Sequence, residues 1–171
     1  DGADALGVAC DVGNEDQVKN LVQGALERFG RIDVAINNAA VTSEFLAGQA
    51  DSFTAFEGYP LQNWESVLRT NLTGPFLVCR EVGKDMKSRH SGSIINVSSI
   101  YGIVGPRHEV YEGMAFQSVA SYSASKAALL GLTRWLASYW AKDAIRVNAV
   151  IPGGVANQQD PEFVRRYSAL A

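Results

Sequence analysis

The segment Arg31-Ile-Asp-Val-Ala-Ile-Asn-Asn-Ala-Ala40 decides the fold class. Its residues 32–37 are apolar at positions that would face both sides of a sheet, as in a central parallel strand covered by helices on each face. Polar residues follow where this strand would end. A parallel strand needs neighbours that run in the same direction, so the flanking sequence must supply further strands and crossover helices.

Helix and strand patterns alternate on both sides of this segment. Residues 6–12 predict a short buried strand, and residues 14–29 predict a helix because apolar side chains recur every three or four positions. Asn14 is a suitable N-cap with Gln17 in the capping-box position, and Gly30 supplies a left-handed stop.

The rest of the chain continues the alternation, which predicts an α/β fold with a doubly wound parallel sheet. The elements expected there are an irregular loop at residues 41–59, a helix at 61–87, a strand at 93–97, a helix at 121–141, a strand at 146–151 and a helix at 160–169. Pro60 suits the first turn of the first of these helices, and Pro75 predicts a kink within it. A chain of 171 residues with 47% hydrophobic content is expected to form one domain over residues 1–171.

The composition argues against several function classes. With 15 Lys and Arg and a formal charge of −3, no nucleic-acid partner is expected. No apolar stretch approaches the ~20 residues that cross a bilayer, so no membrane association is expected. Cys10 and Cys79 have apolar neighbours and no paired spacing, which favours reduced core thiols and a cytoplasmic location. His90 and His108 share no helix face or cysteine partner, so no metal site is expected.

Tyr122-Ser-Ala-Ser-Lys126 carries the strongest chemical signal. Residues four apart on a helix project from the same face, with about 5–6 Å between their Cβ atoms. A phenol with a pKa of about 10 is a poor acid or base at neutral pH, and a neighbouring ammonium favours the phenolate. The pair is therefore a candidate acid/base unit, although this spacing also arises when a half-buried tyrosine precedes a solvated lysine.

Several separated segments, in this order, resemble the short-chain dehydrogenase/reductase family across nearly the whole chain. They are Asp11, Asn37-Asn38-Ala39-Ala40, Asn71-Leu-Thr-Gly74, Asn96-Val-Ser98-Ser99, Tyr122-Ser-Ala-Ser-Lys126 and Pro152-Gly153-Gly154. The resemblance implies a Rossmann-type fold and an oxidoreductase that interconverts a carbonyl and a secondary alcohol. It also implies a small-molecule substrate and assembly as a homotetramer or homodimer.

The resemblance implies a catalytic role for four residues. Tyr122 would protonate the carbonyl oxygen during reduction, and Lys126 would hold the nicotinamide ribose and lower the pKa of Tyr122. Ser99 would hydrogen-bond the substrate oxygen, which its neighbour Ser98 would not. Asn71 would help hold a water behind Lys126 for proton relay.

The implied cofactor is NAD or NADP. The matching contact residues are Asp11 and Val12 at the adenine, Asn38, Ala39 and Ala40 beneath the cofactor, Pro152, Gly153 and Val155 around the nicotinamide, and Tyr122 and Lys126 at its ribose. Turn chemistry after a strand would also explain Asn37 and Asn38, and an ordinary loop would explain residues 152–154.

The chain departs from the family pattern in three places. The first strands and the Gly-rich turn that binds pyrophosphate are missing, so we expect a partial domain cut at its N-terminal side and ending early. The acidic or basic residue that would select NAD or NADP is missing with them. Asn157 stands where relatives often place a threonine that contacts the cofactor carboxamide, and Ala40 is a milder departure at a position where most relatives have glycine. Residues 106–117 form an insertion between Ser99 and Tyr122, and such loops beside a site are usually functional.

The insertion bears on the substrate. Its charged and aromatic composition favours a polar, sugar-like substrate and is similar to reductases of surface-glycan pathways. A surface flap that covers the site or packs on a partner subunit would explain it equally well. His108 within it is a further candidate for substrate contact.

Three alternatives to this enzyme remain open at the level of sequence. Ser123-x-x-Lys126 matches the serine and lysine spacing of penicillin-recognising acyl transferases, but the accompanying Ser-Asp-Asn and Lys-Thr-Gly segments are absent from the sequence. A non-catalytic sensor or structural subunit of the same fold is the second, and a reductase domain from a larger synthase is the third. For assembly, we expect helices 61–87 and 121–141 to supply the shared face, with Trp135 and Tyr139 buried there.

Overall fold

Three parallel strands form the sheet of this computed structural model, which describes residues 2, 4–46, 53–155 and 157–170. The strands are β1 (Val34–Asn37), β2 (Gly92–Val97) and β3 (Ile145–Val150), in the order β1-β2-β3. Asn37 pairs with Asn96, and Asn96 pairs with Ala149, so the carboxyl ends of all three strands are level. The predicted α/β class and parallel sheet are confirmed.

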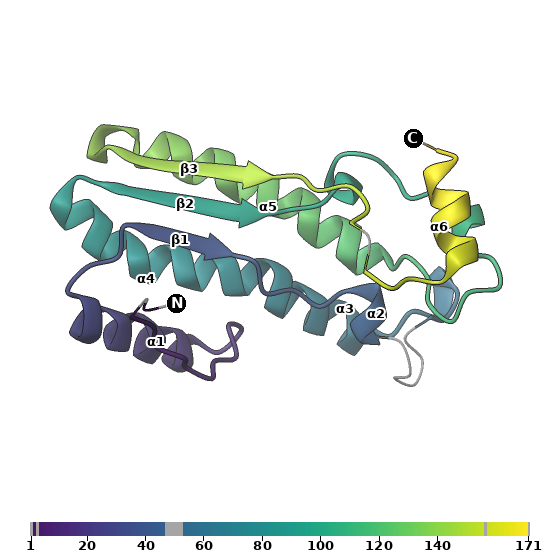
Figure 1. Ribbon diagram of the computed structural model, residues 1–171, viewed down its shortest axis with the longest axis horizontal. Coiled ribbons are helices and arrows are strands. Elements are labelled where there is room, and N and C mark those ends of the chain that lie inside the picture. Colours follow the sequence, from purple (N-terminus) through teal and green to yellow (C-terminus); the bar gives the residue numbers. More distant parts are fainter. Residues whose placement is uncertain (1, 3, 47–52, 156, 171) are drawn as a thin grey trace.

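Helices α4 (Gly74–Arg89) and α5 (Ala120–Tyr139) lie against one face of this sheet (Figure 1). The core between the sheet and these helices contains side chains from both. They are Ala35, Ile94, Ile145 and Val147 of the strands and Cys79, Val82, Met86, Leu136 and Trp140 of the helices and the turn after α5. On the other face Val34 and Ile36 are 55% and 61% exposed. Residues 32–37 therefore have the apolar pattern of a strand covered on both faces, but the described residues cover only one.

Residues 6–12 do not form the buried strand that their apolar pattern predicts. The described part of this segment has no strand pairing, and Leu6 and Val8 are nearly half exposed. A strand is stable only where a neighbour takes up its backbone hydrogen bonds, and none of the three strands pairs with this segment. Instead Asp11 begins a turn, in which Asn14 N donates to Asp11 O at 2.9 Å, that leads into the first helix.

Helix α1 (Glu15–Phe29) has the ends that the sequence predicts. Asn14 Oδ1 accepts hydrogen bonds from the amides of Asp16 and Gln17, both at 3.1 Å. Gly30 ends the helix with φ of 78°. The reciprocal capping-box bond differs from the prediction, because the side chain of Gln17 accepts from Asp11 N at 2.7 Å rather than from Asn14 N.

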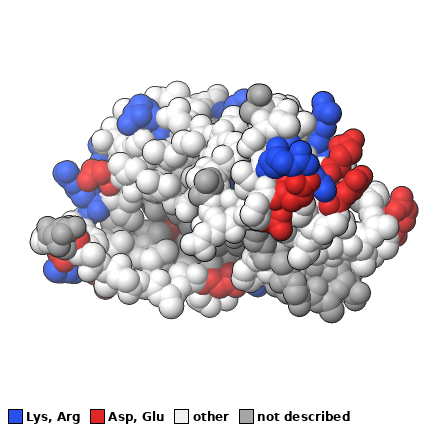
Figure 2. Space-filling model, turned by 45° about the vertical axis from the view of Figure 1, so that its right-hand side comes forward, with Lys and Arg blue, Asp and Glu red and all other residues white. Residues whose placement is uncertain are grey.

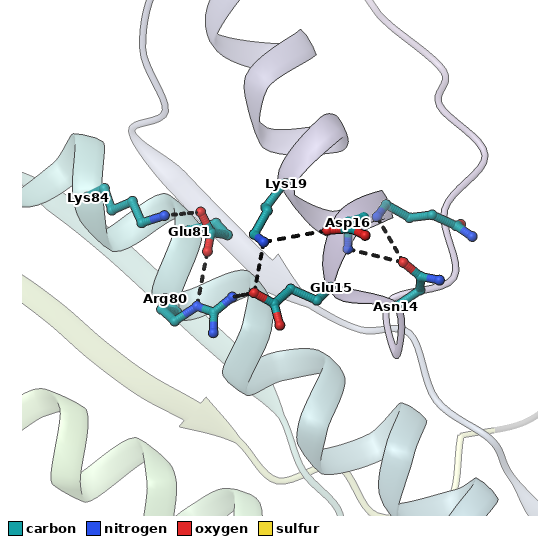
Figure 3. Close-up of polar contacts among 8 residues, drawn as sticks. Asn14, Glu15, Asp16, Lys19, Arg80, Glu81 and Lys84 are labelled. Atoms are coloured by element: carbon teal, nitrogen blue, oxygen red, sulfur yellow. Dashed lines mark hydrogen bonds and ion pairs between the residues drawn. The ribbon is translucent and has the colours of Figure 1, made fainter.

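An ion-pair network joins α1 to α4 (Figure 3). Glu15 accepts from Lys19 at 2.9 Å and from Arg80 at 2.8 Å. Arg80 and Lys84 also contact Glu81, which is buried. Burial raises the pKa of Glu81, but the hydrogen bonds from Lys84 and Arg80 outweigh it and hold the pKa below its usual value. The network therefore keeps a carboxylate ionised while it fixes the two helices together.

The long helix predicted at residues 61–87 is interrupted. Helix α3 (Leu61–Leu68) leads into a π-helical turn, η2 (Arg69–Thr73), before α4 begins at Gly74. Pro75 lies in the first turn of α4, so the interruption occurs where a proline was expected to kink the helix. Wide turns of this kind inside helices are frequent at functional sites.

The remaining elements lie near the carboxyl ends of the strands, except for η5, which precedes β3 at its amino end. They are α2 (Ser43–Leu46), η1 (Phe56–Gly58), η3 (Ile100–Gly102), η4 (His108–Tyr111), η5 (Ala141–Asp143) and α6 (Pro161–Ser168). The segment expected to be an irregular loop at 41–59 thus contains two short helices, and its residues 47–52 lie outside the described residues. Among the helices that the structure describes, none is both long and apolar enough to cross a membrane.

Candidate active site

A pocket of about 240 Å³ lies beyond the carboxyl ends of the strands. Ligands of open parallel sheets bind at this edge. The segments after all three strands reach it, together with the first turn of α5, the insertion and α6. Its lining consists of Thr42, Ser43, Ser99, Ile100, Tyr101, Tyr111, Phe116, Tyr122, Gly153, Gly154, Val155, Gln159, Phe163 and Tyr167.

Tyr122 and Lys126 stand one helical turn apart at the start of α5. Lys126 Nζ lies 5.6 Å from the centroid of the Tyr122 ring and donates to Val97 O at 2.7 Å. Lys126 is only 4% exposed, and this burial lowers its pKa from the usual 10.5 to about 8. Among the described residues, Val97 O is the hydrogen-bond acceptor of this ammonium, which has three N–H groups to donate.

Ser99 is placed as a hydrogen-bond donor toward the pocket. It is the N-cap of η3, and its Oγ accepts from Tyr101 N at 3.2 Å. Because the hydroxyl accepts this bond, its own hydrogen is available to a ligand oxygen. The neighbouring Ser98 turns the other way, and its Oγ donates to Lys126 O at 2.8 Å. The two serines therefore divide between the pocket and the support of α5.

Asn71 lies in the π-helical turn and is 1% exposed. Its side chain accepts from Val41 N at 2.7 Å and donates to Val41 O at 3.0 Å and Ser125 Oγ at 3.3 Å. Ser125 Oγ in turn donates to Tyr122 O at 2.7 Å. Asn71 thus connects the chain after β1 to the turn of α5 that carries Tyr122 and Lys126.

A buried polar network supports the same end of the sheet. Asn37 Nδ2 donates to Asn96 Oδ1 at 2.8 Å, and Asn96 Nδ2 donates to Thr133 Oγ1 at 2.9 Å. Asn37 also contacts Cys79 Sγ at 3.3 Å, and burial raises the pKa of that thiol to about 11. Turn chemistry was one explanation of Asn37 in the sequence, but the residue lies within β1. The sequence pattern did not reveal that the strand register pairs Asn37 with Asn96.

The residues expected to bind the cofactor fall into two groups. Gly153 and Val155 line the pocket, and Pro152 adjoins it with its carbonyl accepting from Ile100 N at 3.0 Å. The others do not line the pocket: Asn38, Ala39 and Ala40 follow β1, and Asp11 and Val12 lie before α1. Asp11 forms an ion pair with Arg69 at 3.0 Å.

The outer wall of the pocket comes from the insertion and α6, which are some 50 positions apart in the sequence. Tyr111 and Phe116 of the insertion pack on Phe163 of α6, with ring centroids 5.4 Å and 5.3 Å from it. Tyr101 and Tyr111 share a hydroxyl hydrogen bond of 2.7 Å. Tyr167 Oη accepts from Gly154 N at 3.0 Å. The sequence marked the insertion as functional but gave no role to these aromatic residues.

The two histidines lie away from this pocket. His90 is exposed at the end of α4, as expected, with Nδ1 3.8 Å from Asp143 Oδ1. His108 lines a neighbouring cavity of about 480 Å³ instead of the one that holds Tyr122. Among the side chains that the structure describes, no group of three or more His, Cys, Asp or Glu could hold a metal ion.

The chain is similar in sequence to a known family of proteins. The family model described as short chain dehydrogenase matches residues 1–166. A 3-oxoacyl-[acyl-carrier-protein] reductase from Synechocystis sp. is 36% identical over 155 residues, which are 91% of this chain and 55% of that protein. The chain therefore spans about half the length of the curated relatives it matches.

Two solved structures are similar to the chain in fold and in sequence. The crystal structure of an NAD⁺-bound xylitol dehydrogenase has a TM-score of 0.74 at 31% identity, with 93% of this chain and 54% of that chain covered. A levodione reductase has a TM-score of 0.75 at 33% identity, with 89% and 52% covered.

Proposed function

The chain belongs to the short-chain dehydrogenase family, and we propose that it carries the acid/base and substrate-binding part of an NAD- or NADP-dependent oxidoreductase. The reaction is the interconversion of a carbonyl and a secondary alcohol. One observation carries the proposal: Ser99 and Tyr122 line one pocket, and buried Lys126 lies directly behind Tyr122.

The residues present fit a nicotinamide cofactor. Lys126 is a buried ammonium with one carbonyl partner among the described residues, so paired ribose hydroxyls would satisfy its other donors. Gly153 lines the pocket without a side chain, which allows close approach of a flat ring. Asn38, Ala39, Ala40, Pro152 and Val155 would border the cofactor, with Asp11 and Val12 at its adenine. The bound cofactor would supply the hydride that is exchanged with the carbonyl carbon.

Tyr122 would act as the acid in reduction and as the base in the reverse direction. Ser99 would donate its hydroxyl hydrogen to the same substrate oxygen and so hold it beside the Tyr122 hydroxyl. Lys126 would favour the phenolate through its positive charge and hold the cofactor ribose. Asn71, bonded to Val41 and Ser125, would fix the chain beside this group and support proton relay behind Lys126.

The proposed substrate is polar and sugar-like. Hydroxyl and amide groups of Thr42, Ser43 and Gln159 lie among aromatic rings in the pocket lining, and relatives include proteins named for xylitol and levodione. A 3-oxoacyl thioester is the second candidate, because a 3-oxoacyl-[acyl-carrier-protein] reductase is 36% identical.

We also propose a homotetramer or homodimer in the cytoplasm. Trp135 and Tyr139 of α5 are 60% and 52% exposed and stack with ring centroids 4.8 Å apart. Such an exposed aromatic pair suits an interface between subunits. The free thiols of Cys10 and Cys79 suit a reducing compartment. Size measurement of the full-length protein at micromolar concentration tests the assembly, and a monomer alone would overturn it.

The test of the reaction is nicotinamide oxidation by the full-length protein. Keto-sugars, simple ketones, keto acids and acetoacetyl-CoA are offered with NADH and NADPH in parallel. Tyr122→Phe should abolish turnover, whereas Tyr59→Phe is the matched control, since Tyr59 bonds to Ser121 outside the pocket. Cofactor binding without turnover of any substrate would favour the non-catalytic alternative.

A further inference from the structure

Arg166 joins α6 to the main chain of the insertion. Its Nη1 donates to Glu112 O at 2.7 Å and to Glu109 O at 3.3 Å. Its Nε donates to Glu162 Oε1 at 2.8 Å, which fixes the guanidinium on its own helix. Arg165 also pairs with Glu162, at 2.6 Å and 2.7 Å, but the described contacts of Arg165 do not include the insertion. Two adjacent arginines therefore share one partner, and only Arg166 bridges to the loop.

Glu162, the acidic partner of both arginines, is ionised and can accept their hydrogen bonds. Hydrogen bonds from Arg165 and Arg166 lower the pKa of Glu162 to about 2, so its carboxylate is charged throughout the neutral range. Figure 2 shows acidic and basic side chains side by side toward the end of the molecule that carries α6 in Figure 1. The side chains of Arg166 and Glu162 are partly exposed, while the rings of Tyr111, Phe116 and Phe163 line the pocket.

The same junction is packed by aromatic rings. Phe163 of α6 meets Tyr111 and Phe116 of the insertion, and Tyr167 lies 5.7 Å from Phe163. Tyr111 also reaches Tyr101, two residues after Ser99, through their hydroxyl pair. A displacement of α6 from the insertion would therefore open the pocket beside the residues that bind the substrate oxygen.

The pocket behind this wall is small and uncharged. Its volume of about 240 Å³ is below the roughly 300–1,000 Å³ of pockets that take drug-sized ligands. Among the described residues that line it, none is Lys, Arg, His, Asp or Glu. A carboxylate or phosphate bound there would lose its hydration without an ionic partner in the lining. Aromatic faces with scattered hydroxyls instead suit the flat surface of a ring.

We infer that the insertion and α6 form one wall that selects a compact, uncharged, ring-shaped carbonyl substrate, and that Arg166 is the positioning residue that keeps this wall closed. The inference rests on the proposed function and narrows its substrate class. It separates the chain from enzymes that bind an extended acyl thioester or a keto acid. The insertion is then a part of the specificity pocket and not a passive surface flap.

The role of Arg166 has a distinct kinetic consequence. If only the closed wall binds substrate well, the apparent dissociation constant is the intrinsic one divided by the closed fraction. Loss of the bridge lowers that fraction in the free enzyme, whereas bound substrate restores closure. KM should therefore rise while kcat is retained, which general destabilisation of the fold would not produce.

The experiment compares Arg166→Gln with the matched control Arg165→Gln in the full-length protein. Substrates are cyclohexanone and cyclohexane-1,2-dione as rings, pyruvate as a keto acid and acetoacetyl-CoA as a thioester. Arg166→Gln should raise KM for the two ring substrates about tenfold, with kcat within about twofold of the wild type. The reason is that the variant loses the charged hydrogen bonds of the guanidinium. Arg165→Gln should leave both constants within about twofold, and Arg166→Lys should lie between, since one ammonium replaces a fork.

Hydrogen exchange of residues 106–117 gives a readout that does not need turnover. Exchange should quicken in Arg166→Gln and remain unchanged in Arg165→Gln. Equal exchange and equal KM in the two variants would overturn the role of Arg166. Wild-type preference for pyruvate or acetoacetyl-CoA would overturn the substrate class. If the wild type reduces none of the four, the proposed substrate class fails, whereas turnover of a keto-sugar would leave the proposed oxidoreductase function standing. Exchange still decides whether Arg166 holds the wall.

Discussion

The two sides of the pocket are held by different kinds of contact. On the strand side, buried side chains bond to main-chain groups: Lys126 to Val97, Ser98 to Lys126, and Asn71 to Val41. On the outer side, aromatic rings pack on one another, and a part-exposed arginine, Arg166, reaches loop carbonyls.

This difference separates the proposed chemistry from the proposed selection of substrate. Buried polar groups tolerate little change, because an unpartnered donor or acceptor retains its full desolvation cost. Ring contacts at a surface can be rearranged residue by residue with smaller losses. Variants on the strand side should therefore affect rate and fold, whereas variants on the outer side should affect mainly KM.

Lys126→Met should show the largest effect. Removal of the ammonium would remove both the ribose contact and the charge beside Tyr122, so kcat/KM should fall about 10²–10⁴-fold. Steady-state kinetics with the best substrate measure this. Lys142→Met is a suitable control because Lys142 lies in η5, away from the pocket lining. Activity close to wild type in Lys126→Met would remove Lys126 from the proposed mechanism.

Asn71→Ala should show the next largest effect, and in stability as well as rate. The change leaves Val41 N–H and C=O without their side-chain partner in a partly buried setting, at a cost of about 1–3 kcal/mol in the free energy of unfolding. Urea unfolding measures the loss. Unchanged stability would mean that another group replaces the amide.

Phe163→Ala should act on substrate binding alone. Phe163 contacts three rings of the outer wall, and its removal should raise KM about tenfold without a comparable loss of kcat. Val164→Ala, on the same helix and 41% exposed, should leave KM unchanged. A fall in kcat as large as the rise in KM would show that the outer side takes part in the chemical step.

The smallest effect is a pH dependence of stability. Burial lowers the pKa of Lys126 to about 8 in the folded protein, below its usual 10.5. The unfolded chain therefore binds more protons between these values, and stability should rise with pH from about 8 to about 10.5 relative to Lys126→Met. Below pH 8 the cost of burying the ammonium is present in full. Free energies of unfolding that change with pH in the same way in both proteins would contradict the burial argument.

The sequence predicted the strand side far better than the outer side. The alternation of strands and helices placed β1, β2 and β3 to within one or two residues, and Asn14 and Gly30 marked both ends of α1. The prediction failed at residues 6–12, because an apolar run does not specify a partner strand. The π-helical turn at Asn71 was also missed, since Pro75 predicts a kink but not its form.

The outer side depends on contacts that local patterns do not encode. Arg166 and Glu112 are 54 positions apart, and the ring of Phe163 meets Phe116 only once the insertion has folded back. The length of the insertion predicted a functional role, but its partner on α6 came from the three-dimensional arrangement.

The division between the two sides is tested most directly by the rate of hydride transfer in a single turnover. Saturating cofactor and substrate are used with the wild type, Tyr122→Phe and Arg166→Gln. The account predicts that Tyr122→Phe slows this step at least about a hundredfold, while Arg166→Gln stays within about twofold of the wild type. An unchanged rate in Tyr122→Phe, or an equal loss in Arg166→Gln, would contradict it.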